Sequence, residues 1–144
     1  MSAATAAAAP KLTLPAPAKV NYFLHITGQR DDGYHTLETL FVLIDLADSV
    51  TLALRDDGVI ARDHDVEGIA AEDDLCLRAA RALKDAAPRR ASQPALGVSV
   101  GLSKRIPLGG GLGGGSSDAA SVLLGLNRLW SLDLPRAALA EIGV

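Results

Sequence analysis

The sequence predicts a mixed α/β fold, because segments that alternate with a period of two occur in the same chain as segments with helical spacing. Strand-like alternation covers residues 18–28, 35–58 and 95–104, and helical spacing follows Asp73 and Ser116. With 144 residues, 49% of them apolar and 22% charged, the chain has the length and composition of one folded domain.

The first clear strand is predicted over residues 18–28, after two prolines that favour extended backbone. Alternate side chains of a strand share a face, so Lys19 and Asn21 are expected to point the same way. We expect residues 1–14 to hold a flexible Ala-rich tail and a first strand segment, ahead of a domain that spans 15–144.

The middle of the chain predicts two further strands and a helix. Residues 35–46 and 48–58 have strand-like alternation, and the acidic segment 45–48 predicts a turn between them. From Asp73, which we expect to be the N-cap, apolar side chains recur at three- and four-residue spacing until Pro88 ends the helix.

A glycine-rich segment joins the last predicted strand to the next helix. The strand over 95–104 leads into RIPLGGGLGGGSSDAAS at 105–121, which holds six glycines within seven positions. Ser116 or Ser117 is expected to cap the helix that follows, with Asp118 in its first turn. A last short helix is predicted for PRAALAEI near the end of the chain.

This strand–glycine loop–helix order predicts an anion site, because it gathers free main-chain N–H groups and the positive end of a helix dipole around one point. A phosphate is the favoured ligand, ahead of a purely structural turn or a linker. No lysine follows the last glycine, so the loop is not a Walker A motif. A G-x-G-x-x-G match is almost unavoidable in such a sequence, and the other segments of a protein kinase are not found.

Composition and charge exclude several classes of function. The net charge of −3, without a basic run, argues against nucleic acid as a partner. The single cysteine, Cys76, argues against a disulfide framework and favours the reducing cytoplasm; we expect it to be a core residue. No apolar run is long enough to span a membrane, and the Asp63–Asp65 cluster is expected to be a solvated turn and not a metal site.

The motifs PxxxGLGGGSSDAA at 107–120 and PAKVNYFLHITGQRDDGYH at 17–35 resemble those of the GHMP kinases, which phosphorylate small molecules. Together with the following T-L-E-T-L, the second motif is most similar to the family of 4-diphosphocytidyl-2-C-methyl-D-erythritol kinases, which act in non-mevalonate isoprenoid biosynthesis. The resemblance covers nearly the whole chain from about Pro15.

The resemblance implies a two-layer α/β (α+β) N-terminal domain, similar to a domain of a ribosomal protein, with a left-handed β-α-β crossover. It also implies phosphorylation of a hydroxyl on the methylerythritol moiety of a cytidine diphosphate ester, with ATP as phosphoryl donor and Mg²⁺ as its companion. The alternatives are a kinase of the same family that acts on another small alcohol, and a non-catalytic nucleotide-binding module of the same fold.

The resemblance also assigns roles to individual residues. Lys19 would lie beside the acceptor hydroxyl and activate it, Asn21 would orient the substrate, and Tyr34 and His35 would contact the cytosine ring. No metal ligand is assigned. The positions that would hold the ATP phosphates are Pro107, Leu108, Gly109, Gly110, Gly111, Leu112, Gly113, Gly114, Gly115, Ser116 and Ser117.

The sequence departs from the family pattern at its end. The family carries a catalytic aspartate in a G-A-D-V-P-like segment, followed by a second domain, and neither has a counterpart before the chain ends at EIGV. We therefore expect either a fragment of a longer enzyme or a chain without activity. Without a second domain, exposed apolar surface is expected to cause poor solubility or self-association.

Overall fold

The structure, a computed structural model, describes residues 9–88 and 95–143; the Ala-rich segment before residue 9 lies outside them. The described residues form a four-stranded sheet, three α-helices and one 3₁₀ helix. In chain order these elements are β1 (Lys11–Gln29), β2 (His35–Arg55), β3 (Ile60–Arg62), η1 (Ala71–Asp73), α1 (Leu75–Ala86), β4 (Gly97–Ser103), α2 (Gly114–Leu129) and α3 (Arg136–Ile142).

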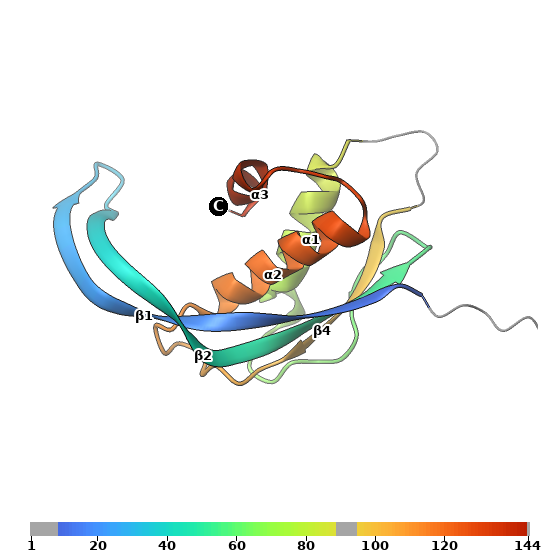
Figure 1. Cartoon of the computed structure of the whole chain (residues 1–144), viewed down its shortest axis with the longest axis horizontal. Helices are drawn as coiled ribbons and strands as arrows, with labels where there is room; N and C mark the ends of the chain where they lie inside the picture. The colour runs from blue at the N-terminus through green and yellow to red at the C-terminus, as the bar shows by residue number, and fades with distance from the viewer. Residues whose placement is uncertain (1–8, 89–94, 144) are drawn as a thin grey trace, which may run out of the picture.

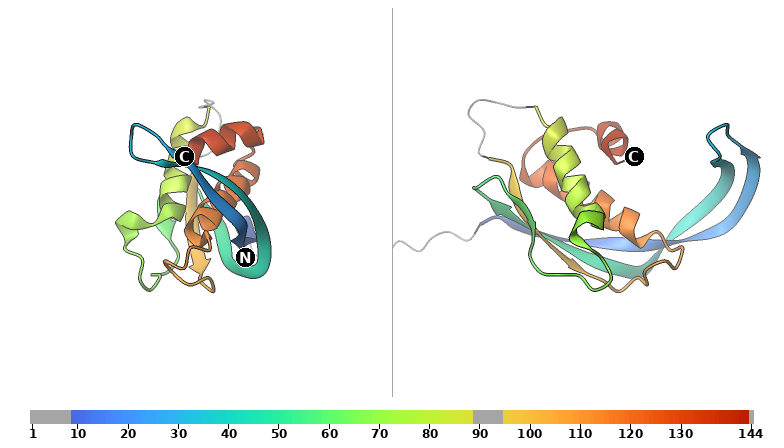
Figure 2. Two further views of the ribbon diagram at one scale, coloured as in Figure 1. Left: turned by 90° about the vertical axis from the view of Figure 1, so that its left-hand side faces the viewer. Right: turned by 180° about the vertical axis from the view of Figure 1, so that it is seen from behind.

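The sheet and the helices form two layers, with the helices on one face of the sheet (Figures 1 and 2). The strand order is β1-β2-β4-β3; β1 pairs with β2 and β2 with β4 in antiparallel fashion, and β3 runs parallel to β4. The chain passes from β3 to β4 through η1 and α1, which makes a β-α-β crossover. The predicted α+β class is confirmed, and the left hand of the crossover remains a prediction.

The predicted turn at 45–48 is wrong, because β2 runs without interruption from His35 to Arg55. Asp45 is exposed, as a turn residue would be, but Asp48 is 1% exposed and lies opposite Ala16 of β1. Asp45 and Asp48 give this segment the composition of a turn. Asp48 is nevertheless buried within the strand, because it has partners from another part of the chain.

β1 is also longer than predicted. It begins at Lys11, opposite Ala53 of β2, so the expected boundary between residues 14 and 15 falls inside a single strand. The register shifts after Pro17, Asn21 and Ile26, and each irregularity interrupts strict alternation of side chains. Lys19 and Asn21 lie between two of these shifts and therefore keep the shared face that the sequence predicts.

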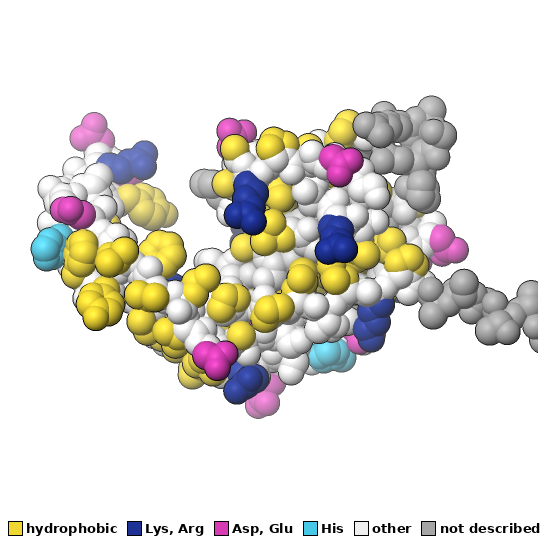
Figure 3. Space-filling model, viewed as in Figure 1, with side chains coloured by type: hydrophobic (Ala, Val, Ile, Leu, Met, Phe, Trp, Pro, Cys, Tyr) yellow, Lys and Arg dark blue, Asp and Glu magenta, His cyan; other side chains and the backbone are white. Residues whose placement is uncertain are grey.

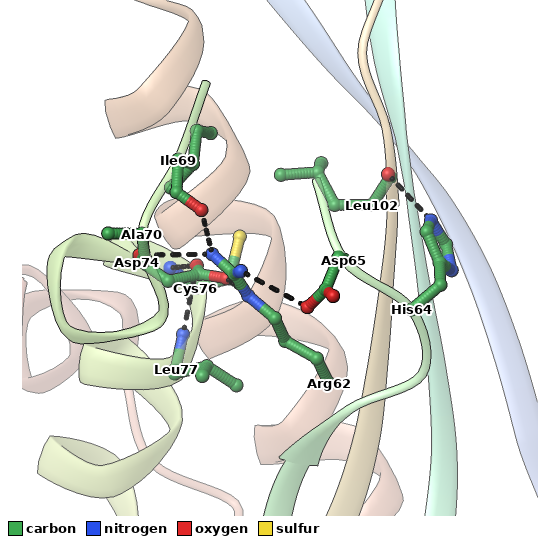
Figure 4. Close-up of polar contacts among 9 residues, drawn as sticks. All are labelled: Arg62, His64, Asp65, Ile69, Ala70, Asp74, Cys76, Leu77 and Leu102. Atoms are coloured by element: carbon green, nitrogen blue, oxygen red, sulfur yellow. Dashed lines mark hydrogen bonds and ion pairs between the residues drawn. The ribbon is translucent and has the colours of Figure 1, made fainter. Parts of the chain in front are cut away.

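A buried ion pair fixes the start of α1 against β3 (Figure 4). Asp74, not Asp73 as predicted, is the N-cap, and its carboxylate accepts hydrogen bonds from the amides of Cys76 and Leu77. The guanidinium of Arg62 contacts the same carboxylate at 2.6 Å and also donates to carbonyls of the preceding segment. Asp73 lies one residue earlier, in η1, so the capping role moved by a single position.

The core lies between the sheet and the two long helices. α2 lies close to the sheet at Gly125, where a Cβ atom would come within 2.4 Å of Leu52 on β2. This close approach holds α2, and the loop that precedes it, directly over β1 and β2. The large side chains that are fully buried in this layer include Val50, Leu52, Leu83, Val98, Val122 and Leu126.

Candidate functional site

The glycine loop, residues 107–113, connects the end of β4 to the start of α2. Gly109, Gly111 and Gly113 have φ values of 73°, 69° and 71°, and they alternate with residues whose φ is not positive. Such alternation turns successive N–H groups inward and makes a concave site for an anion. The loop geometry therefore fits the predicted phosphate site.

Gly113 is the N-cap of α2, so the prediction that Ser116 or Ser117 caps the helix is wrong. Left-handed backbone at Gly113 lets the helix begin three or four residues earlier than a cap at Ser116 or Ser117 would allow. The amides of the first three helical residues, 114–116, have no partner within the helix, and Ser117 is the first to bond back, to the carbonyl of Gly113 at 3.0 Å. These amides remain free to bind a ligand.

Lys19 lies directly against the glycine loop. Its amide donates to the carbonyl of Leu112 at 2.9 Å, and a Cβ on Gly113 would lie only 3.2 Å from its Cγ. The absence of a side chain at Gly113 therefore makes room for the lysine stem. The structure brings together the lysine and the loop, which are more than 90 positions apart in the sequence.

A short polar network holds the head of Lys19. Its ammonium donates to the side-chain oxygen of Asn21 at 2.5 Å, and the amide nitrogen of Asn21 donates to the hydroxyl of Thr39 at 2.7 Å. Thr39 in turn donates to the carbonyl of Phe23. Thr39 thus orients Asn21 so that its oxygen faces the lysine, a role that the sequence did not reveal because the partner lies on β2.

A charged cluster lies beside the two ends of the glycine loop. It consists of Asp48, Lys104 and Asp118. The ammonium of Lys104 contacts a carboxylate oxygen of Asp48 at 2.5 Å and one of Asp118 at 2.9 Å. Both aspartates are 1% exposed. The second oxygen of Asp48 accepts hydrogen bonds from the amides of Arg105 and Ile106, just before the loop.

The two carboxylates of this cluster differ in pKa. Burial opposes ionisation of Asp48, but hydrogen bonds from the Ile106 amide, the Lys104 ammonium and the Arg105 amide outweigh it, so its pKa lies below the usual value. Burial raises the pKa of Asp118 to about 6, although Lys104 acts in the opposite direction. Asp118 accepts no amide hydrogen bond to offset its burial, and its Oδ1 has no partner among the described residues.

A cavity of about 250 Å³ adjoins the loop and the charged cluster. Leu108, Gly115, Lys104 and Asp118 line it together with residues of the segment that leads into α1. A ligand that entered this cavity beside the free helix amides would meet a buried carboxylate and an ammonium.

Tyr34 and His35 lie at the turn end of the β1–β2 hairpin, well away from Lys19. The two strands continue beyond the helices as a curved arm, residues 20–43, and Tyr34 and His35 belong to its tip (Figure 1). The tip curves toward the side of the sheet that carries the helices (Figure 1). Tyr34 is 74% exposed, so the structure shows it accessible but does not bring it beside the loop.

The other sequence candidates are structural. Cys76 is 1% exposed, and burial raises the pKa of its thiol to about 12, so the predicted core role is confirmed. Asp63, His64 and Asp65 are exposed, as expected of a solvated turn, and His64 contacts the carbonyl of Leu102 (Figure 4). None of the helices that the structure describes is both long and apolar enough to cross a membrane.

Comparison with known proteins places this geometry in a family. Residues 74–144 match the family described as GHMP kinases N terminal domain. The chain is 52% identical over its whole length to the 4-diphosphocytidyl-2-C-methyl-D-erythritol kinase of Cupriavidus metallidurans, and covers 48% of that protein. It is 56% identical over 130 residues, 90% of this chain and 45% of the relative, to the protein of the same name from Thiobacillus denitrificans.

Solved structures agree with this assignment. A crystal structure of 4-(cytidine 5'-diphospho)-2C-methyl-D-erythritol kinase superposes with a TM-score of 0.75 at 39% identity, over 92% of this chain and 46% of the other. A mevalonate kinase structure, at 18% identity and a TM-score of 0.64 over 92% and 45% of the two chains, shares the fold. The chain spans about half the length of the curated relatives that it matches.

Proposed function

Because the chain belongs to the GHMP kinase family, we propose that its glycine loop binds the phosphates of ATP. The protein would then transfer the terminal phosphoryl group to a hydroxyl of 4-diphosphocytidyl-2-C-methyl-D-erythritol. The observation that carries this proposal is the contact of Lys19 with the glycine loop. A lysine whose stem lies against a phosphate site suits phosphoryl transfer, since this chemistry depends mainly on positioning and on neutralising charge.

In this reaction the acceptor hydroxyl oxygen forms a bond to the terminal phosphorus of ATP, ADP leaves with the electrons of the broken P–O bond, and the hydroxyl proton passes to solvent. The free amides at the start of α2 would hold the phosphates, with hydroxyls of Ser116 and Ser117 adding donors. The ammonium of Lys19, aligned by Asn21, would stabilise negative charge on the attacking oxygen.

Mg²⁺ would enter this site with the nucleotide. Within residues 9–88 and 95–143 no group of three His, Cys, Asp or Glu side chains is arranged to hold a metal ion. Mg²⁺ usually keeps several waters and is held largely by the phosphates of its nucleotide, so an open loop without a preformed acidic cage fits that mode of binding. The ion would neutralise charge on the phosphates.

The arm offers the second part of the substrate site. Tyr34 and His35 would contact the cytosine ring, whereas the reacting hydroxyl would lie at Lys19. The path along β1 from Lys19 to Gln29, which pairs with His35, is about 30 Å at 3.3 Å per residue. Curvature of the arm toward the helix side shortens this gap, so a substrate would extend along the concave side of the arm (Figure 1).

The test is phosphoryl transfer by the protein that the complete gene encodes, with Lys19→Ala as the informative variant. We expect turnover to fall at least about 100-fold while ATP affinity changes little, because Lys19 acts on the acceptor oxygen. Lys11→Ala is the matched control, since Lys11 lies at the exposed start of the same strand. Unchanged turnover in Lys19→Ala would refute the assigned role.

The same assay separates the alternatives. Transfer to mevalonate or homoserine, and none to the cytidine diphosphate ester, would favour a kinase that acts on another alcohol. ATP binding without transfer to any alcohol would favour a non-catalytic nucleotide-binding module.

A further inference from the structure

Lys104 lies where the two ends of the glycine loop come together. It follows β4 directly, at the entry to the loop, and its ammonium contacts Asp118 of α2, beyond the exit. The same ammonium contacts Asp48 of β2. A Cβ on Gly114, the first residue of α2, would lie 3.2 Å from this nitrogen, so Lys104 also lies against the start of the helix.

Asp48 extends the link to the backbone at the entry of the loop. One of its oxygens binds Lys104, and the other accepts the amides of Arg105 and Ile106. Ile106 is 2% exposed and lies beneath Gly114, where a Cβ would come within 3.0 Å of its side chain. Entry and exit of the loop are therefore joined twice, by an ion pair and by close packing.

Electrostatic attraction of phosphate does not explain the cluster. One ammonium and two carboxylates give it a formal charge of −1 when all three groups are ionised. A net negative charge beneath an anion site opposes phosphate binding. A buried ion pair is also weak evidence for stability, because well-packed apolar residues often serve equally well. The cluster is better explained by its effect on the geometry of the glycine loop.

We propose that Lys104 is a positioning residue of the glycine loop, whose ammonium ties Asp48 to Asp118 and so holds the free amides of α2 in place before nucleotide arrives. This inference rests on the proposed function, since it assumes that the loop binds nucleotide phosphates. Preorganised donors bind better than mobile ones because their ordering cost is already met by the fold.

The decisive variant is the double substitution Lys104→Met with Asp118→Asn. It removes the tie between the two ends of the loop, and its single remaining carboxylate keeps the formal charge of the cluster at −1. In the protein encoded by the complete gene, we expect the Kd and the KM for ATP to rise at least tenfold. The KM for the alcohol should stay within twofold, and the loop amides should exchange faster with solvent in the absence of nucleotide.

Lys84→Met is the matched control. Lys84 is also half-buried and donates to a loop carbonyl, that of Gly58, but it lies away from the glycine loop. We expect it to leave ATP binding unchanged. If the double variant does not fold, Asp118→Asn alone decides through amide exchange, because it replaces the ion pair between Lys104 and Asp118 by a weaker contact. We then expect the loop amides to exchange faster with solvent in the absence of nucleotide, and unchanged exchange would overturn the role of Lys104.

The outcomes distinguish this inference from the proposed function. A wild-type protein that does not bind ATP overturns the proposed function, and with it the role of Lys104. A wild-type protein that binds ATP, with a folded variant of equal affinity and equal amide exchange, overturns the role of Lys104 alone.

Discussion

The glycine loop and the arm are the two regions from which the candidate site is built, and they are supported in opposite ways. The loop rests on buried residues: Asp48, Asp118 and Ile106 are each at most 2% exposed. The arm exposes many large apolar side chains along both strands (Figure 3). These are Val20, Tyr22, Phe23, Leu24, Ile26, Leu37, Leu40, Phe41, Val42 and Leu43.

The difference follows from strand pairing. From Ser49 onward β2 pairs with both β1 and β4 and is covered by α2, whereas before Ser49 it pairs with β1 alone. A two-stranded ribbon is marginally stable by itself in water. The part of the site proposed to hold phosphate therefore rests on buried residues, and the part proposed to hold the base lies on a two-stranded ribbon with exposed apolar side chains.

The largest effect is expected from Asp48→Ala, which would test how much the loop depends on its support. The substitution leaves the Lys104 ammonium with one partner fewer and the amides of Arg105 and Ile106 without an acceptor. We expect a loss of about 3–5 kcal/mol in the free energy of unfolding. Urea denaturation measures it, and Asp45→Ala on the exposed part of the same strand is the control.

Asp118→Asn should show the next largest effect, as a change with pH. The pKa of Asp118 is about 6 in the folded protein, above the ordinary value of 3.8. Folded protein therefore binds the proton more tightly, and wild type loses stability as the pH rises from about 4 to 6. An asparagine does not titrate, so the variant should gain about 2–3 kcal/mol relative to wild type over this range.

Urea unfolding of both proteins at pH 4, 5, 6 and 7 measures this difference. A difference that stays constant, or that falls with rising pH, would contradict the raised pKa of Asp118.

Gly113→Ala should have a smaller effect on the free energy of unfolding, and it should also weaken the binding of ATP by the loop. Left-handed backbone costs a residue with a Cβ about 1–2 kcal/mol, and the added methyl would lie 3.2 Å from the stem of Lys19. We expect that loss in unfolding free energy together with weaker ATP binding. Gly33→Ala, also at positive φ but in open space at the arm tip, should show the strain without the loss of ATP binding.

Sequence alone predicted the parts of the site that lie within continuous motifs. The glycine loop between strand and helix, and the shared face of Lys19 and Asn21, follow from local backbone rules. Residues whose partners are distant could not be found in this way. Asp48 had the composition of a turn and Lys104 that of a strand end, and their pairing spans 56 positions.

The start of α2 shows that prediction from sequence can also fail where the residues involved are neighbours in the chain. Serine is the commoner cap, and the sequence offered two, but three positive-φ glycines let α2 begin at Gly114. Asp118 then falls on the buried face and not at an exposed helix start. Capping propensity favours the two serines, but the left-handed backbone of the loop makes Gly113 the N-cap instead.

The smallest effect is expected from Leu43→Ala on the arm. Leu52→Ala, in the buried part of the same strand, is the substitution to compare with it. Leu43 and Leu52 lie on the same strand, but Leu43 is 62% exposed and Leu52 is fully buried. Leu52→Ala should cost about 2–5 kcal/mol in unfolding free energy, and Leu43→Ala less than about 0.5 kcal/mol. Denaturation of this 144-residue chain measures both values.

A substantial cost of Leu43→Ala would show that the arm is already packed in solution, against a second copy or another part of the protein. Sedimentation at rising concentration then separates these cases, because only association of copies depends on concentration. A cost below about 0.5 kcal/mol without association would confirm that the arm is a bare ribbon. In that case the base site proposed at the arm tip would lie on a ribbon without further support, whereas the proposed phosphate site rests on buried residues.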